Sequence, residues 1–283
     1  MKFSSLFFYL LTKKQRMENG KQVVDGNLEG IKKSLEGSLK RLKTDYIDIY
    51  QFHNPSFCPK PGDGTGLYEA MLEAKAQGKI HFIGLTNHRL PVAIEACESG
   101  LYDTIQFPFS YLADQKDIDL VNKCKENNIG FICMKALSGG LINRSDAAYA
   151  YLAQFDNVLP IWGIQKESEL DEFISYQTKA PELTQEIQDL IAHDRKELAG
   201  DFCRGCGYCM PCPKGIQINQ CARMSLMLRR APAASWLNDH WQAEMKKIEE
   251  CLNCGKCKQH CPYHLNTPKL LKKNYEDYKT FLK

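Results

Sequence analysis

Long apolar runs are missing from this 283-residue chain, and no hydrophobic stretch is long enough to span a membrane. Met1–Leu11 (MKFSSLFFYLL) imitates a secretion signal, but no small-residue cleavage site follows it. Hydrophobic residues make up 43% and charged residues 25%, as in ordinary globular proteins. We therefore expect a cytoplasmic protein that does not bind a membrane.

Cysteine, by contrast, is abundant: there are 13, and eight of them form two quartets. The spacings are C-x2-C-x2-C-x2-C-P and C-x2-C-x2-C-x3-C-P. The second is typical of bacterial-type 4Fe–4S proteins, in which the fourth cysteine of a run serves the other cluster. We therefore expect two 4Fe–4S clusters. Their ligands would be Cys203, Cys206, Cys209 and Cys261 for one, and Cys251, Cys254, Cys257 and Cys212 for the other.

Zinc and disulfide bonds are the alternative uses of these cysteines. Zinc sites place two Cys-x2-Cys pairs on either side of a spacer, and disulfides do not suit a reducing interior. Neither matches four cysteines crowded into one loop. Cys221 is an alternative ligand to Cys212, because the last gap of the first quartet is one residue short. We favour Cys212 for its Cys-Pro context.

The net charge of +3 hides an asymmetry between the two parts of the chain. Residues 201–283 carry 14 Lys and Arg against 7 Asp and Glu, whereas residues 1–200 carry 23 against 27. A basic segment can bind nucleic acid, but these lysines are spread along helical sequence rather than clustered. They would offset the negative charge of the clusters, so we expect no nucleic-acid partner.

Before the quartets, strand and helix patterns alternate regularly. Apolar residues between Asn27 and Leu42 recur at helical spacing, and the short apolar run Leu6–Leu11, just before Lys13, is interpreted as the first strand. Further strands are expected at Tyr46–His53, Ile80–Thr86, Thr104–Phe109, Ile129–Met134 and Val158–Ile164. Strands joined by helical crossovers predict a TIM-type (β/α)8 barrel, here with six strand–helix units instead of eight. We expect this partial barrel and a connector helix in residues 1–200, and a small α-helical, ferredoxin-like dicluster domain in residues 201–283.

Several segments together resemble the aldo-keto reductase family, in particular its subgroup with a C-terminal ferredoxin domain. They are Ser38–Asp48, Gln51–Asn54, Gly78–Ile80, Ile83–His88, Gln106, Met134–Gly140 and Cys206–Pro213. The resemblance implies an oxidoreductase that transfers hydride between NADPH and a small carbonyl or alcohol at the C-terminal mouth of the barrel. The catalytic set of the family is Asp, Tyr, Lys and His.

The resemblance also implies a role for individual residues. Lys13 matches the Lys that lowers the pKa of the proton-donating Tyr, and His53 matches the His that orients the carbonyl. Thr86, Asn87 and Gln106 would hold the nicotinamide carboxamide, Ser138, Gly139 and Gly140 the pyrophosphate, and Gly163, Gln165 and Ser168 the adenosine end.

The chain also departs from the family pattern. The catalytic Asp and Tyr of the family lie on two strand–helix units that would precede the strand of Lys13, and nothing here matches them. We expect roughly fifty further residues upstream of Met1. The alternative is a degenerate barrel that only supports an electron-transfer iron–sulfur module. The clusters would pass electrons to the hydride site or to an electron-carrier protein. Because a one-electron cluster does not couple directly to hydride transfer, an intermediary such as a flavin is implied, unless the clusters are structural.

Overall fold

The computed structural model describes residues 9–11, 15–18, 21–24, 28–198, 202–230 and 233–282. The chain forms two compact units. Unit 1 comprises residues 1–107, 114–133 and 157–159, and unit 2 comprises residues 108–113, 134–156 and 160–283. The second unit therefore joins the cysteine region to segments that precede residue 200. The domain boundary expected at that residue stays a prediction.

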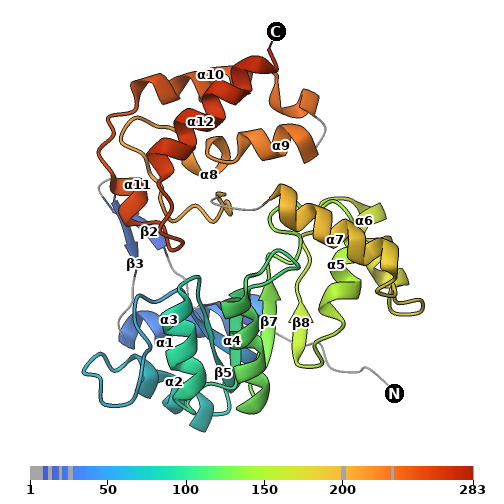
Figure 1. Ribbon diagram of the computed structural model, residues 1–283. Helices are drawn as coiled ribbons and strands as arrows, with labels where there is room; N and C mark the ends of the chain where they lie inside the picture. The colour runs from blue at the N-terminus through green and yellow to red at the C-terminus, as the bar shows by residue number, and fades with distance from the viewer. Residues whose placement is uncertain are drawn as a thin grey trace. The chain divides into compact units, whose positions relative to one another are not determined.

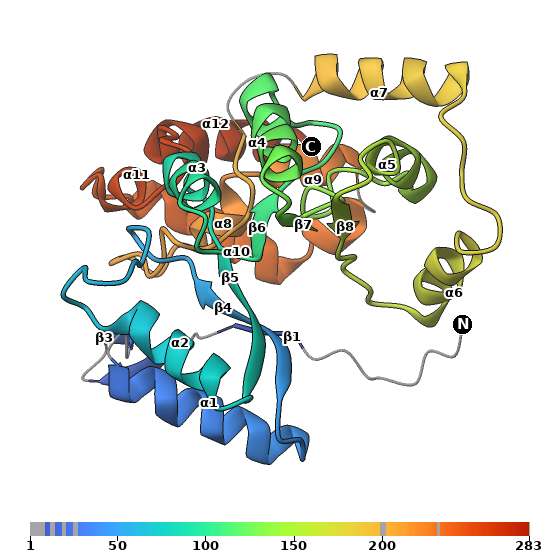
Figure 2. The ribbon, with the colours of Figure 1, turned by 90° about the horizontal axis from the view of Figure 1, so that it is seen from below.

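The main sheet has six strands in the order β1-β4-β5-β6-β7-β8. Its last two strands lie side by side in Figure 1, and all six are labelled in Figure 2. They are β1 (Tyr9–Leu11), β4 (Ile47–His53), β5 (Ile80–Thr86), β6 (Thr104–Pro108), β7 (Gly130–Met134) and β8 (Val158–Pro160). The pairs β1–β4, β4–β5 and β5–β6 are parallel. Because strands that follow one another along the chain are neighbours in the sheet, each crossover leads to the next strand, as in a TIM barrel.

Helices connect these strands. They are α1 (Leu28–Leu42), α2 (Leu67–Ala76), α3 (Leu90–Glu98), α4 (Gln115–Glu126), α5 (Ser145–Leu152), α6 (Glu167–Ser175) and α7 (Gln185–Glu197). In α1 the buried side chains Ile31, Leu35 and Leu39 recur every four residues. This periodicity of buried residues is the pattern from which the sequence predicts a helix here. Helices α2 and α3 both pack against β5 (Figure 2).

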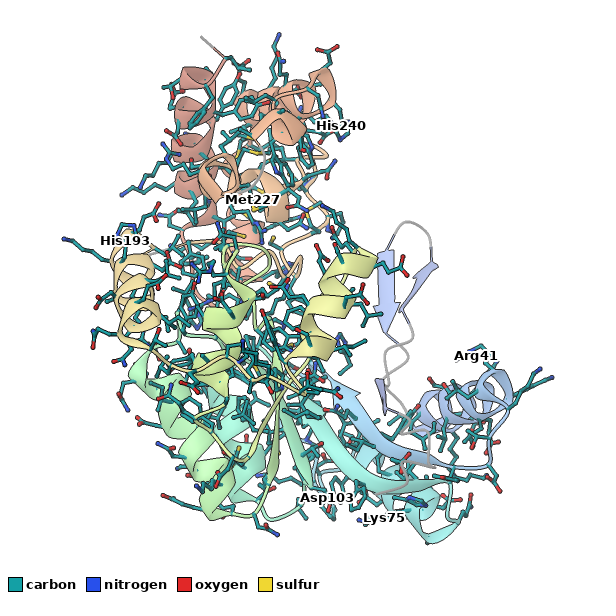
Figure 3. All side chains as sticks on the ribbon, turned by 90° about the vertical axis from the view of Figure 1, so that its right-hand side faces the viewer. Arg41, Lys75, Asp103, His193, Met227 and His240 are labelled. Carbon is teal, nitrogen blue, oxygen red and sulfur yellow. The ribbon has the colours of Figure 1, made fainter. Side chains whose placement is uncertain are left out.

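A charged side chain, Asp103, lies just before the start of β6 and bonds to the neighbouring strand β5. Its Oδ2 accepts a hydrogen bond from the Ile83 backbone N–H at 2.8 Å. The same oxygen lies 3.4 Å from Nζ of Lys75, and the two side chains lie side by side in Figure 3. This end of a barrel sheet serves stability, whereas chemistry belongs to the opposite end.

Two features of the sheet differ from the expectation. Strand β8 ends at Pro160, four residues earlier than expected, because proline has no N–H to donate to a strand pair. The residues that would have continued it are exposed, Ile161 at 40% and Ile164 at 42%. An antiparallel hairpin of β2 (Gln15–Glu18) and β3 (Lys21–Val24) was not expected at all.

The cysteine region of unit 2 is helical, as expected. Its elements are α8 (Ile218–Cys221), α9 (Met224–Arg230), η1 (Ala233–Trp236), α10 (Asp239–Lys246), η2 (Lys247–Glu250), α11 (Lys256–Gln259) and α12 (Thr267–Thr280). Their apolar faces form one core that includes Ile218, Met224, Met245, Leu271 and Tyr278. Across the described part of the chain, no helix combines the length and the apolar character that crossing a membrane requires.

Candidate metal centres and strand ends

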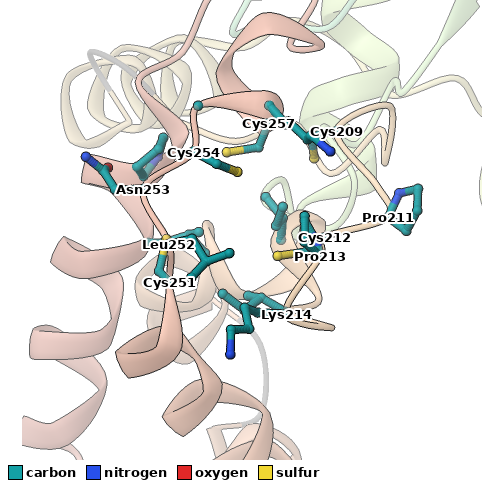
Figure 4. A pocket seen from close by; sticks show the side chains of 16 residues that line it. Cys209, Pro211, Cys212, Pro213, Lys214, Cys251, Leu252, Asn253, Cys254 and Cys257 are labelled. Carbon is teal, nitrogen blue, oxygen red and sulfur yellow. The ribbon is translucent and has the colours of Figure 1, made fainter.

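The four cysteines expected to hold one of the clusters line a single pocket. They are Cys212, Cys251, Cys254 and Cys257, with Cys209 beside them (Figure 4). Asn253 (φ 50°) and Gly255 (φ 72°) adopt left-handed backbone conformations that bend the loop between the second-quartet cysteines. The pocket is therefore lined by cysteines of both quartets, together with apolar side chains such as Ile216, Ile218 and Leu271.

The other expected set is gathered as well. Burial raises the pKa of Cys203 and of Cys206, and the pKa of each is raised further by the neighbouring Cys261. Burial also raises the pKa of Cys209 to about 12, with added contributions from Cys203 and Cys206. Cys203, Cys206 and Cys261 thus lie within electrostatic reach of one another, as ligands of one cluster would. Cys209 lies within reach of Cys203 and Cys206, and also of Cys257 from the other set.

Backbone N–H groups point at the sulfurs. The N–H of Gly205, in a left-handed conformation at φ 65°, donates to Sγ of Cys203 at 3.4 Å. Backbone N–H groups of Tyr208 and Lys258 likewise act on Cys206 and Cys257 and oppose the rise of their pKa. Such donors stabilise thiolates, the form of cysteine that binds metal.

The donor set suits an iron–sulfur cluster. Neither residues 202–238 nor residues 251–275 contain any Asp or Glu, so the two cysteine loops offer sulfur and almost no carboxylate oxygen. Among the described residues, no three Cys, His, Asp or Glu side chains converge closely enough to hold a single ion. A cluster of four irons is wider than one ion, so its ligands do not have to converge on one point.

Cys221, the alternative ligand, lies elsewhere. It is fully buried at the end of α8, and its Sγ approaches the carbonyl oxygen of Glu244 at 4.0 Å. Burial raises its pKa to about 12. It does not line the pocket that contains Cys212.

In unit 1, three of the expected site residues form a row across neighbouring strands. His53 is paired in register with Thr86, and Thr86 with Gln106. Thr86 is 2% and Gln106 5% exposed, while His53 is half-buried. All three lie at or near the C-terminal ends of parallel strands, the end of a barrel where ligands bind.

Asn87, the next expected contact, is engaged within the protein. Its Nδ2 donates to the Pro55 carbonyl at 2.8 Å, and its Oδ1 accepts from the backbone N–H groups of His88 and Arg89, both at 2.9 Å. The side chain therefore organises the loops that follow β4 and β5. Gln51, a neighbour without an expected role, donates through Nε2 to Oε1 of Gln106 at 3.3 Å.

The expected phosphate and adenosine contacts belong to unit 2. Ser138 (φ 48°), Gly139 (φ 66°) and Gly140 (φ 89°) form a left-handed turn after β7, and Oγ of Ser138 lies 2.9 Å from Oγ of Ser110. Gly163, Gln165 and Ser168 are exposed around the start of α6. Lys13 lies outside the described residues, so its role stays a prediction.

A sheet of TIM-barrel type followed by two cysteine loops defines a barrel protein with an iron–sulfur domain. Comparison with protein families supports both parts. Residues 7–158 match the aldo/keto reductase family, and residues 202–266 match the 4Fe-4S dicluster domain. The chain belongs to the aldo/keto reductase family.

Curated relatives match parts of the chain. Methylglyoxal reductase DkgB of Salmonella typhi is 41% identical over 93 residues, which are 30% of this chain and 33% of that protein. The NADH-specific methylglyoxal reductase of Escherichia coli is 32% identical over 114 residues, 40% of this chain and 35% of that protein. The chain thus spans about a third of the length of these relatives.

A solved structure with a similar fold is the holo form of aldo-keto reductase AKR11C1 from Bacillus halodurans. It superposes with a TM-score of 0.50 at 22% identity, covering 60% of this chain and 68% of that one. At this identity the match supports the barrel-type fold alone.

Proposed function

We propose that this chain is an iron–sulfur oxidoreductase that binds two 4Fe–4S clusters and exchanges hydride between NADPH and a small carbonyl or alcohol. The observation that supports the proposal is the gathering of the quartet cysteines into two groups, which share Cys209 and lie next to N–H groups that favour thiolates. Each set combines cysteines from both quartets, as in two-cluster proteins. The hydride site is the less complete part of the proposal, because it rests on family membership and on the row of His53, Thr86 and Gln106.

The residues of unit 1 would bind and orient rather than react. Bound NADPH would supply hydride, and the clusters would supply one-electron transfer. The hydroxyl of Thr86 and the amide of Gln106 offer donors and acceptors that suit a carboxamide, and the half-buried His53 imidazole can orient a carbonyl oxygen. Methylglyoxal, the substrate named for two of the relatives, is the first carbonyl to test.

A second candidate function is electron transfer by the cysteine region, with the barrel as scaffold. It is favoured by Asn87, whose amide oxygen and nitrogen are already bonded within the protein. The basic, acid-free cysteine loops would then face an acidic electron-carrier protein.

Titration of the anaerobically reconstituted protein separates the two functions. Loss of the nicotinamide absorbance when NADPH and methylglyoxal are both present supports the enzyme. His53→Gln should then lower kcat/KM by about 10²-fold. His81→Gln, on the exposed start of β5, is the matched control and should leave the rate unchanged. Cluster reduction by a reduced acidic ferredoxin, without any NADPH binding, supports the electron-transfer module instead.

A further inference from the structure

Arg223 is a buried cation beside the first cysteine quartet. It lies between α8 and α9 and is only 6% exposed, which is unusual for arginine. Its Nη2 donates to the carbonyl oxygen of Gly139 and to Sδ of Met227, the latter at 2.9 Å. Both acceptors are neutral, so neither balances the charge of the guanidinium.

The remaining surroundings of Arg223 do not balance this charge either. Its buried Nε–H has no hydrogen-bond partner among the described residues. Burial lowers the pKa of Arg223, and the thiol of Cys203 acts in the opposite direction. Burying an unbalanced charge is costly, so a group that carries negative charge is expected next to it.

Two glycines leave room for the guanidinium. A Cβ at Gly205, in the first cysteine loop, would lie 2.5 Å from Nη1 of Arg223, and a Cβ at Gly139 would lie 2.8 Å from the same atom. A side chain at either position would collide with the guanidinium and displace it. Gly139 belongs to the turn that was expected to approach a pyrophosphate. Within unit 2 this turn packs against Arg223, which also lies against the first cysteine loop.

We propose that Arg223 is the fixed counter-charge of the cluster held by Cys203, Cys206, Cys209 and Cys261, and that it raises the reduction potential of that cluster. The inference rests on the proposed cluster ligation. A 4Fe–4S cluster with four thiolates is anionic, and one-electron reduction makes it more so. A guanidinium stays positive at every working pH, and its attraction for the added electron is strong in a poorly solvated site.

A potentiometric titration of the full-length, anaerobically reconstituted protein tests the proposal. Dithionite supplies one electron to each cluster, and electron paramagnetic resonance follows the reduced fraction. In Arg223→Gln one of the two waves should move to lower potential. At the wild-type midpoint the ratio of reduced to oxidised cluster should fall at least about tenfold, which is about 59 mV for a one-electron couple. Arg223→Lys keeps a positive charge, so the midpoint potential of this variant should lie close to that of the wild type.

Two control variants identify the cluster whose reduction wave is shifted. Arg229→Gln removes an arginine from α9 that is exposed and paired with Asp277, and it should leave both waves in place. Cys254→Ser removes a proposed ligand of the other cluster, and the wave that remains should still respond to Arg223→Gln.

The outcomes are distinguishable. If Arg223→Gln has its full iron content and unchanged midpoint potentials, the proposal is overturned, whether or not NADP⁺ binding weakens. A shift confined to the other cluster also overturns it. If Arg223→Gln loses a cluster, retention of that cluster in Arg223→Lys supports the charge role, and its loss there too overturns it. Wild-type protein without two clusters overturns instead the proposed function on which the inference rests.

Discussion

The strand ends of unit 1 and the cysteine loops of unit 2 differ in how far hydrogen bonds within the protein satisfy their polar groups. At the strand ends the fold satisfies most of them: the Asn87 amide makes three hydrogen bonds, and Gln51 donates to Gln106. The buried Oε1 of Gln51 has no hydrogen-bond partner among the described residues. In the cysteine loops, thiols lie close together and raise one another's pKa. The strand ends thus satisfy most of their polar groups by hydrogen bonds within the protein, whereas the cysteine loops gather acidic groups at a cost that a bound metal would offset.

The largest expected effect tests the cysteine loops directly. Cys212→Ser should lose about four of about eight iron atoms, because Cys212 lines the pocket of the second quartet. Cys221→Ser should keep all of them, because Cys221 is packed against the backbone of α10. Iron and sulfide analysis of reconstituted protein measures the difference. If Cys221→Ser loses a cluster and Cys212→Ser keeps both, the ligand assignment is wrong.

A smaller effect is expected inside the barrel sheet. Gly84 lies in β5, where a Cβ would come within 2.7 Å of Cγ of Gln51 and would also collide with Oγ1 of Thr104. Gly84→Ala should therefore lower the free energy of unfolding by about 3 kcal/mol, as overpacking does. Gly130→Ala is the control, since its Cβ would lie 3.5 Å from Cγ2 of Thr104. Equal stabilities of the two variants in urea would contradict this account.

The third effect concerns a polar group that the fold does satisfy within the cysteine region. Asn274 of α12 is buried; its Nδ2 donates to the carbonyls of Ala222 and Leu270, and its Oδ1 accepts from the Ser225 N–H at 2.8 Å. Asn274→Ala leaves these groups unpaired and should lower the free energy of unfolding by about 2 kcal/mol. Lys272→Ala, on the exposed face of the same helix, should change it little. A neutral Asn274→Ala would show that water replaces the lost bonds.

The smallest effect is electrostatic. The hydrogen bond from Arg229 lowers the pKa of Asp277, so the pair stabilises the fold by about 0.5 kcal/mol. A lowered carboxyl pKa gives stability that is complete above the ordinary Asp value of about 3.9 and is lost as the pH falls through the lowered value. The difference in unfolding free energy between wild type and Asp277→Asn should follow this curve. If the difference in unfolding free energy persists in strong acid, it arises from packing and not from the ion pair.

Much of the barrel was predictable because its signals are local. The four-residue recurrence of Ile31, Leu35 and Leu39 defines α1, and Ile80–Thr86 was expected as a strand with the bounds that β5 has. Strand β8 was expected to be longer because Ile161 and Ile164 are apolar, yet both are exposed. Local hydrophobicity does not reveal whether a partner strand is present to bury it.

By itself, the sequence determined the two cysteine quartets and the alternation of strands and helices, because both are patterns of neighbouring residues. The tertiary structure alone decided which cysteines share a pocket, that Asn87 is held within its loops, and that Arg223 is buried beside Cys203. Each depends on residues distant in the chain, such as Gly139 and Arg223, whose proximity no local spacing encodes. Burial then sets the charge balance, because a cation that is harmless in water needs a counter-charge once solvent is removed.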